Sequence, residues 1–396
     1  MEAVDQGSSV TTLELFFDLV FVFALTQVTA WMAAGEGAPT AQAVVRGVLI
    51  VTVLWWCWVG YAWLCNVVKA DEGMVRLGLF VAMAIMFIAA LTIPEAFVDL
   101  PGGLFGPAVF ALCYFLVRAV HIGMFWLASD EDPQLRRQLL RFVWPMLWGT
   151  VMLLVASQTE GTVQTVLWVV ALLGDYVGTQ LGGTDWRLRS ARHFAERHGL
   201  IIIVALGESI VSIGIGVVDL PISWPIVAGS ILGLAAVAAL WWAYFDVTAL
   251  ITERALAAAE GANQIRLARG GYSFLHLPMM VGVIMLALGL KKALGYIAGD
   301  DGHDLTDPIY GVSLIALYGG TVLYLLGHIG FKYYVAGQVS PARIGVVILV
   351  GLLVPVVWFT PALVTLAVLA VVLCGLIGFE THRFAEQRHA IRHEHG

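Results

Sequence analysis

The chain has 396 residues, of which 60% are hydrophobic and only 12% are charged. A soluble domain has roughly 45–50% apolar and about 25% charged residues, so no soluble fold could bury this much apolar surface. The formal net charge is -7. The charges of a membrane protein must first be assigned to sides of the bilayer, so this value identifies no partner and does not indicate a nucleic-acid ligand.

A membrane-spanning helix needs about 20 mainly apolar residues. Runs of this kind predict an all-α polytopic membrane protein with about twelve spanning helices. In chain order, the expected helices cover residues 13–33, 44–68, 75–94, 104–128, 139–157, 163–182, 200–218, 224–248, 272–297, 309–334, 343–359 and 361–379. The last two are the weakest, because Pro341, Pro355 and Pro361 could instead mark one re-entrant element. Ten or eleven spans therefore stay compatible with the sequence.

Lysine and arginine are enriched in short cytoplasmic loops. If the N-terminus is cytoplasmic, nearly all of the 21 lysines and arginines lie on the cytoplasmic side. Arg46, Lys291 and Lys292 lie on the opposite side, and Arg118 falls within a span. We therefore expect both termini in the cytoplasm and the chain in a cytoplasmic (inner) membrane.

Three segments of the first half resemble segments of the second half in the same order. ELFFDLVFVFALTQ faces ERHGLIIIVALGES, LWWCW faces LWWAY, and VRAVHIGMF faces YLLGHIGFK. Each half holds six expected helices, so two copies would share one orientation in the membrane. The sequence predicts a six-helix repeat over residues 1–192, a second over residues 193–380, and a basic, His-rich cytoplasmic tail over residues 381–396. Chance similarity between apolar segments is the alternative interpretation.

Ionisable side chains within the expected spans are costly to bury, so each needs a partner, water or a function. Most lie in the half of the bilayer that the charge distribution assigns to the cytoplasm. We expect them to gather at one polar centre, with the carboxylates compensating Arg118 and the histidines. The candidates for a substrate or proton pathway are Glu14, Asp18, Arg118, His121, Glu208, Asp246, His276 and His328.

A structural role is the competing interpretation of these residues. Glu14, Asn66, Asp246 and Lys332 lie within about a turn of the ends of their expected helices, where caps and snorkelling side chains are common. Arg118, His121 and Glu208 are deeper and could form purely structural ion pairs. No arrangement of residues in the sequence predicts a metal site or a bound cofactor. No nucleophile motif and no phosphate-binding motif is visible.

The runs ELFFDLVFVFALTQVT, ERHGLIIIVALGESIV and HLPMMVGVIMLALGLKKAL resemble the bacterial low temperature requirement protein A (LtrA) family. The resemblance covers the chain from Leu13 to about Phe379. It implies a multi-spanning bacterial membrane protein linked by name to growth in the cold, and it supplies no substrate or reaction. The family motifs highlight Glu14, Phe17, Asp18, Asn66, Glu196, Arg197, Gly207, Glu208, His276 and Pro278. The expected supporting residues are Phe17, Asn66, Glu196, Arg197, Gly207 and Ser209, together with Asp175 and Lys332, which are ionisable residues of the expected spans.

Three classes of function compete. A secondary transporter or proton-coupled carrier of an unidentified small solute or ion is favoured by the expected repeat and the buried titratable groups. A membrane-embedded enzyme or a lipid-binding stress protein is favoured by a polar cluster on one side, although the sequence leans against an enzyme. An ion or proton channel would need polar residues through the outer half as well. Membrane lipids are the expected partners, and the sequence leaves room for a homodimer.

Overall fold

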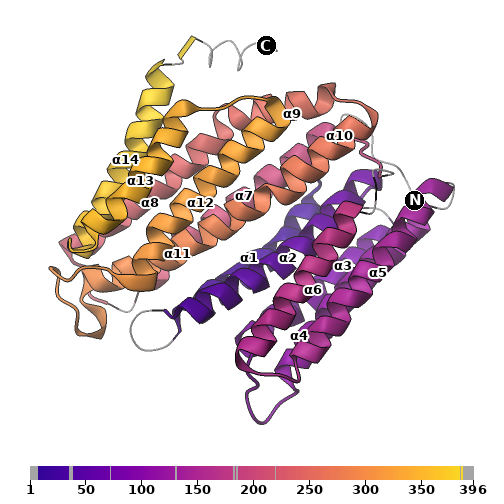
Figure 1. Ribbon diagram of the computed structural model, residues 1–396, viewed down its shortest axis with the longest axis horizontal. Coiled ribbons are helices and arrows are strands. Elements are labelled where there is room, and N and C mark those ends of the chain that lie inside the picture. Colours follow the sequence, from indigo (N-terminus) through magenta and orange to yellow (C-terminus); the bar gives the residue numbers. More distant parts are fainter. Residues whose placement is uncertain are drawn as a thin grey trace. The chain divides into compact units, whose positions relative to one another are not determined.

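The computed structural model describes residues 8–34, 39–71, 73–129, 132–181, 183, 186–218, 220–383 and 385–386. These residues form helices and connecting turns, and no β-strand occurs among them. The α-helices are shown in Figure 1: α1 (Thr12–Ala33), α2 (Ala41–Val67), α3 (Gly73–Leu91), α4 (Gly106–Ala128), α5 (Pro133–Ala156), α6 (Gly161–Leu181), α7 (Ala191–Ile215), α8 (Trp224–Phe245), α9 (Thr248–Ala258), α10 (Gly261–Leu267), α11 (His276–Ala298), α12 (Gly311–Ala336), α13 (Pro341–Val357) and α14 (Ala362–Arg383).

Eleven helical segments in the described residues are long and apolar enough to cross a membrane. Each of the twelve expected spans corresponds to a helix, but α13 has only 17 residues and is shorter than the other eleven. The doubtful pair of expected spans therefore forms two separate helices, α13 and α14, of unequal length. The structure thus supports eleven full-length candidate spans and one short apolar helix.

Two helices, α5 and α7, begin more than one helical turn before the residue that the hydropathy pattern predicts. Helix α5 starts at Pro133, where the carboxylate of Asp132 accepts hydrogen bonds from the first free backbone N–H groups. Helix α7 starts at Ala191, so Arg197, which we expected in a loop, lies within the helix and is fully buried. Polar residues in the first turns of both helices lower the hydropathy there and hide the helix starts.

The chain divides into two compact units. The first unit comprises Met1–Trp31, Val45–Arg197 and Ala259–Ala268, and the second comprises Met32–Val44, His198–Ala258 and Arg269–Gly396. In the first unit α3 packs against α4, α4 against α5, and α5 against α6. In the second unit α12 packs against α11 and α13, and α14 packs against α8. The six-plus-six repeat and the orientation in the membrane stay predictions.

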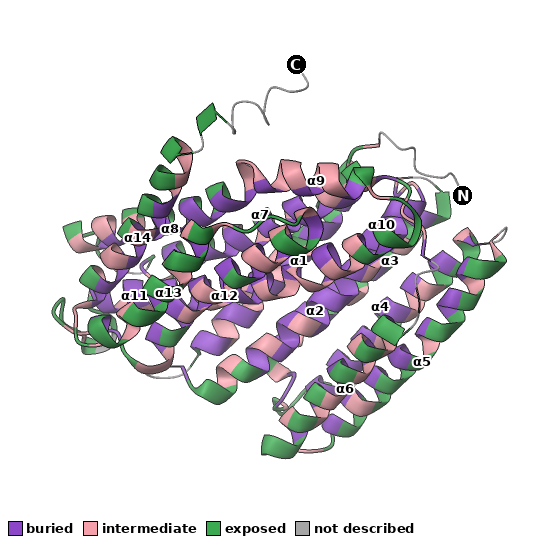
Figure 2. Cartoon of the chain, turned by 45° about the horizontal axis from the view of Figure 1, so that its top comes forward, coloured by how far each residue is buried: buried purple, intermediate pink, exposed green. Residues whose placement is uncertain are grey.

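Large apolar side chains lie on the outside of many helices. In Figure 2, exposed residues follow α5 and α6, whereas α2 is buried along most of its length. Trp144 on α5 and Leu173 and Val177 on α6 are examples, with 74%, 57% and 52% of their surface exposed. A soluble protein rarely exposes such continuous apolar faces, but a lipid bilayer solvates them.

Glycines allow α11 and α12 to approach closely in the second unit. A Cβ atom added at Gly282 would lie 2.5 Å from the backbone nitrogen of Tyr324, and one added at Gly320 would lie 2.6 Å from that of Leu286. Gly289 faces Leu317 in the same way. Close packing of backbones through small residues is a general way in which membrane helices associate.

A π-helix, Ala268–Phe274, joins α10 to α11. At its end the N–H of Leu275 donates to the carbonyl of Gly270, five residues back, at 3.1 Å. Gly270 and Gly271 leave no room for a side chain, because an added Cβ would overlap Tyr334 and Val335 of α12. Segments of π-helix often occur at functional sites, and this one positions the residues around His276.

Candidate functional site

Glu14 closes the first turn of α1. Its carboxylate accepts hydrogen bonds from the backbone N–H and the hydroxyl of Thr11 at 2.9 and 3.0 Å, and its own N–H donates to the Thr11 hydroxyl at 3.3 Å. This reciprocal pattern is a capping box. The exposed Glu196 binds the neighbouring backbone, accepting from the N–H of Val10 at 3.1 Å. Glu14 therefore has the structural role that was one of the two sequence interpretations, but it also has buried partners.

Asp18 lies one turn further along α1 and binds Arg197 of α7. The two guanidinium NH groups lie 3.1 Å from the two carboxylate oxygens of Asp18. The indole N–H of Trp58 on α2 donates to the same carboxylate at 2.8 Å. Arg197 also donates to the backbone carbonyl of Glu14 at 2.8 Å and lies 3.7 Å from its carboxylate. Asp18 and Arg197 are no more than 1% exposed, so this ion pair lies in the protein interior.

His193 connects Glu14 to the start of α7. Its Nε2 lies 3.0 and 3.1 Å from the two carboxylate oxygens of Glu14. On the other side of the ring, the amide nitrogen of Asn66 lies 3.3 Å from Nδ1 and also donates to the carbonyl of Ser190 at 2.7 Å. The amide oxygen of Asn66 accepts from the N–H of Arg189 at 2.8 Å. Because the amide nitrogen faces Nδ1, the proton of a neutral His193 lies on Nε2 and points at Glu14.

We name Glu14, Asp18, His193 and Arg197 the acid–arginine cluster. The spacing of its members explains the pairing, because Glu14 and Asp18 are four residues apart on α1 and His193 and Arg197 are four apart on α7. Two carboxylates face one permanent cation and one imidazole. With both acids ionised and the imidazole neutral, the cluster carries one surplus negative charge, and a single added proton makes it neutral. Burial of an unpaired charge is costly, so the cluster favours holding that proton.

Arg118 has a different partner from the one that we expected. On α4 it lies 3.3 Å from the carboxylate of Asp175 on α6, which also accepts a short hydrogen bond from the hydroxyl of Tyr114. The expectation that Glu14 and Asp18 compensate Arg118 was wrong, because Asp175 is nearer and Arg197 occupies those two acids. The pair of Arg118 and Asp175 is neutral in charge and fully buried.

His121 and Phe17 lie among aromatic rings in the first unit. The imidazole of His121 contacts Tyr61 and Phe125 at centroid distances of 5.4 and 5.2 Å. Phe17 packs against Phe21 and Tyr61 at 5.4 and 5.0 Å. These two residues therefore form part of the packed core around α2.

In the second unit His276 lies at the centre of a buried network. The hydroxyl of Tyr244 lies 2.9 Å from its Nε2, and the carbonyl of Gly271 lies 3.2 Å from its Nδ1. A carbonyl can only accept, so Nδ1 carries the proton and Nε2 accepts from Tyr244. The rings of His198 and Tyr272 pack against His276 at 5.2 and 5.4 Å. This arrangement fixes a neutral His276.

His328 on α12 contacts an arginine. Both ring nitrogens lie within 3.0 Å of one NH group of Arg343 on α13, and the rings of Tyr244 and Tyr324 lie at 6.1 and 6.3 Å. The rest of the Arg343 guanidinium binds Glu380 of α14. Arg343 lines the cavity described below, and His328 contacts it without lining that cavity.

Glu208 lies in the middle of α7 and is 1% exposed. It accepts a hydrogen bond from the hydroxyl of Ser212 at 3.0 Å, and Lys291 of α11 attracts it electrostatically. Ser209 lies 3.5 Å from the carbonyl of Val283. A Cβ atom added at Gly207 would meet open space, so no helix contact among the described residues requires a glycine at this position.

Asp246 and Lys332 lie at the ends of α8 and α12 and line the same cavity in the second unit. The expected set of pathway residues therefore forms several groups: the acid–arginine cluster, the pair at Arg118, the network at His276 and the cavity residues. Glu208 and His121 belong to none of these groups.

Sequence reasoning missed His193 as a site residue and gave Arg197 only through the family motif. Both follow Ser190, whose hydroxyl accepts from the N–H of His193 at 3.2 Å and caps α7. Reading Ser190 as a helix cap would have placed both residues on α7, with the same four-residue spacing as Glu14 and Asp18. The histidines of the tail, His389 and His393, lie outside the described residues.

A family model described as bacterial low temperature requirement A protein (LtrA) matches residues 9–378. The chain belongs to this family. A curated relative, an uncharacterized protein of Rhizobium meliloti (strain 1021), is 29% identical over 346 residues, which cover 83% of this chain and 78% of the relative. No solved structure matches this LtrA-family chain. The family and the eleven candidate spans together show a multi-pass membrane protein.

Proposed function

We propose that this protein is a proton-coupled secondary transporter of the bacterial cytoplasmic membrane, and that the acid–arginine cluster is its proton site. The observation that carries the proposal is the charge of that cluster. Two buried carboxylates share one arginine and one histidine, so with both acids ionised and the imidazole neutral the cluster has one surplus negative charge, and one added proton makes it neutral. Intramembrane acids of this kind are typical of proton relays in transporters.

The place of the cluster in its helices supports this role. Glu14 and Asp18 are the third and seventh residues of α1, so Asp18 lies about 10 Å from the start of the helix at roughly 1.5 Å per residue. With the N-terminus in the cytoplasm, as the lysines and arginines favour, a proton reaches the cluster from the cytoplasmic side.

Gain and loss of that proton would change the attraction between α1 and α7. With both acids ionised, Arg197 is shared between Glu14 and Asp18, and a proton on Asp18 weakens its bond to Arg197. The contact between the two helices is therefore stronger in one protonation state than in the other. A difference of this kind between two states is what couples binding of a proton to movement of a solute.

Proton counting on the purified protein tests the site without knowledge of the solute. We expect the wild type to take up one more proton than Asp18→Asn when a lightly buffered sample is titrated from pH 8 to pH 5 against a pH dye. Asp175→Asn is the matched control, because Asp175 already has one full counter-charge in Arg118. Equal uptake by wild type and Asp18→Asn would remove the cluster as the proton site.

Flux in proteoliposomes tests the coupling. Vesicles loaded with pyranine are exposed to a panel of amino acids, organic acids, sugars and amines, and a transported solute should acidify the lumen in the wild type. Asp18→Asn should abolish that acidification. If the purified protein takes up the proton but no solute acidifies the vesicle lumen, the cluster is still a proton site, and the proposal of transport is contradicted.

A further inference from the structure

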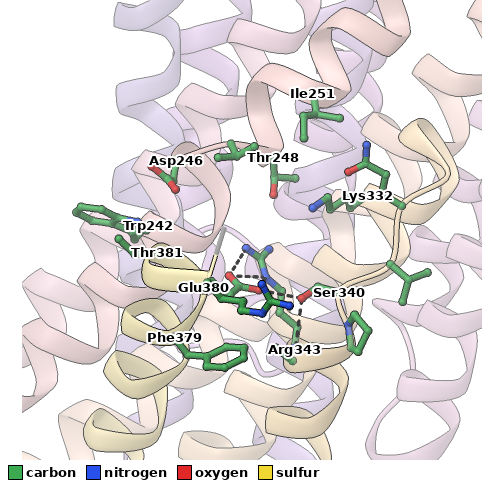
Figure 3. A pocket seen from close by; sticks show the side chains of 16 residues that line it. Trp242, Asp246, Thr248, Ile251, Lys332, Ser340, Arg343, Phe379, Glu380 and Thr381 are labelled. Carbon is green, nitrogen blue, oxygen red and sulfur yellow. Dashed lines mark hydrogen bonds and ion pairs between the residues drawn. The ribbon is translucent and has the colours of Figure 1, made fainter. Parts of the chain in front are cut away.

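The second unit contains a cavity of about 450 Å³ at one end of its helices. Its walls come from the end of α8, the start of α9, the ends of α12 and α14, and the start of α13 with the residues just before it. Figure 3 shows Asp246 and Thr248 on one side, Lys332 on another, and Ser340, Arg343 and Glu380 opposite them. Binding sites for small molecules or head groups commonly have volumes of about 300–1,000 Å³.

One wall of the cavity, formed by Ser340, Arg343 and Glu380, has no net charge. The guanidinium of Arg343 binds Glu380 through Nε at 2.9 Å and through a terminal nitrogen at 2.8 Å. The hydroxyl of Ser340 donates to the same carboxylate at 2.8 Å. Both oxygens of Glu380 are therefore occupied, and this carboxylate is committed to Arg343.

Lys332 faces this wall from α12. In Figure 3 its ammonium group points into the cavity. Arg343 repels it and Glu380 attracts it, so these charges lie within electrostatic reach of each other. Three cations, Lys332, Arg343 and Arg383, and two carboxylates, Asp246 and Glu380, line the cavity. The lining thus has one surplus positive charge, and an anion placed between Lys332 and Arg343 would relieve their repulsion.

The edge of the cavity is apolar. Trp242, Val339 and Phe379 line it and are 39%, 48% and 55% exposed. In a multi-pass membrane protein, such side chains at helix ends contact the lipid. A positive cavity with an apolar edge matches a molecule that has an anionic head and a hydrocarbon tail, and basic pockets between membrane helices are known to hold anionic head groups.

We propose that this cavity binds the phosphate of an anionic phospholipid head group, with Lys332 as the main cationic contact. The phosphate takes the place between Lys332 and Arg343, and the acyl chains lie along Trp242 and Phe379. Free inorganic phosphate presents the same charge without the chains, so the two sources can be separated by experiment. The site does not depend on the proton site of the first unit.

Binding is measured on delipidated, full-length protein in a neutral detergent. Phosphatidylglycerol, phosphatidylcholine and inorganic phosphate are titrated separately, and the binding of each is followed by the rise in melting temperature and by native mass spectrometry. We expect phosphatidylglycerol to bind more tightly than phosphatidylcholine. Lys332→Gln should weaken phosphatidylglycerol binding about tenfold, which corresponds to roughly 1.4 kcal/mol.

Two further variants keep the test falsifiable. Lys332→Arg keeps the charge and should retain binding within about threefold, which separates loss of charge from loss of fold. Arg137→Gln removes an exposed positive charge on α5, in the first unit, and should leave binding unchanged. Tight binding of inorganic phosphate alone would assign the cavity to a soluble anion. Equal binding of phosphatidylglycerol and phosphatidylcholine, or an unaltered Lys332→Gln variant, would overturn the proposal.

Discussion

The first unit joins helices through buried full charges, whereas the second relies mainly on neutral rings and close backbone packing. Arg197 links α7 to α1, and Arg118 links α4 to α6, each through a carboxylate in the interior. In the second unit His276 is held neutral between Tyr244 and Gly271, and glycines bring α11 and α12 together. A buried ion pair is directional and costly to break, but a packed neutral interface is not sensitive to protons.

This difference suggests that the helix contacts of the two units respond differently to protons. The first unit contains the group that would gain or lose a proton, so its helix contacts would respond to pH. In the second unit, the neutral His276 network and the α11–α12 interface provide a contact that does not need to change. The ion pair between Arg343 and Glu380 joins α13 to α14 at the wall of the cavity and is not part of the α11–α12 interface.

The largest expected effect on this difference between the units comes from removing Arg197. Arg197→Met leaves Glu14 and Asp18 without their permanent counter-charge, and we expect a loss of about 3–5 kcal/mol of stability, the cost of breaking a buried pair. The thermal unfolding of the purified protein in detergent measures it. The triple variant Glu14→Gln, Asp18→Asn, Arg197→Met removes all three charges and should recover much of the loss. A melting temperature of Arg197→Met equal to that of the wild type would show that the pair is not needed.

The matching change in the second unit is steric. In Gly282→Leu the new side chain meets the backbone of α12 at Tyr324 and Gly320, so we expect a loss of about 1–3 kcal/mol or more from overpacking. Gly375→Leu on α14 is the control, because open space surrounds its position. Similar melting temperatures for the two variants would contradict the close approach of α11 and α12.

The sequence predicted most of the fold because apolar runs of about 20 residues carry that information directly. The structure has a helix at every span that the sequence predicts, and Glu14, Asp18 and Arg118 are buried as expected. The prediction failed where polar residues begin a helix, since Arg192, His193, Glu196 and Arg197 together resemble a loop. Hydropathy also cannot give pairing, because Asp175 and Asp18 were equally available to Arg118 until the structure gave the distances.

A smaller change tests the neutral network around His276. Tyr244→Phe removes the donor to Nε2 and leaves a buried acceptor without its hydrogen bond, which costs about 1–3 kcal/mol. Thermal unfolding at pH 7 measures the loss. Tyr333→Phe, at a residue that is 61% exposed, removes the same hydroxyl and should be close to neutral. If the two variants have the same melting temperature, the hydrogen bond between Tyr244 and His276 contributes nothing to stability.

The smallest expected effect concerns the cap of α5, outside the spans. Asp132 accepts from the backbone N–H groups of Gln134 and Leu135 and binds Arg187 at 3.0 Å. Partial burial raises the pKa of Asp132, but the hydrogen bond from Leu135 and the charge of Arg187 outweigh it and hold the pKa below its usual range. We expect Asp132→Ala to cost about 1 kcal/mol at pH 7.

The sign of the pH dependence follows from that lowered pKa. A carboxyl with a depressed folded-state pKa stabilises the fold fully above its unfolded pKa of about 3.9, and the contribution is lost as the pH falls through the folded value. The difference in melting temperature between wild type and Asp132→Ala should therefore be constant from pH 7 to about pH 5 and then shrink below about pH 4. Asp132→Asn keeps a good cap without a titrating group, so its difference from Asp132→Ala should not depend on pH. A difference between wild type and Asp132→Ala that grows on acidification would show that the carboxylate is not the stabilising form.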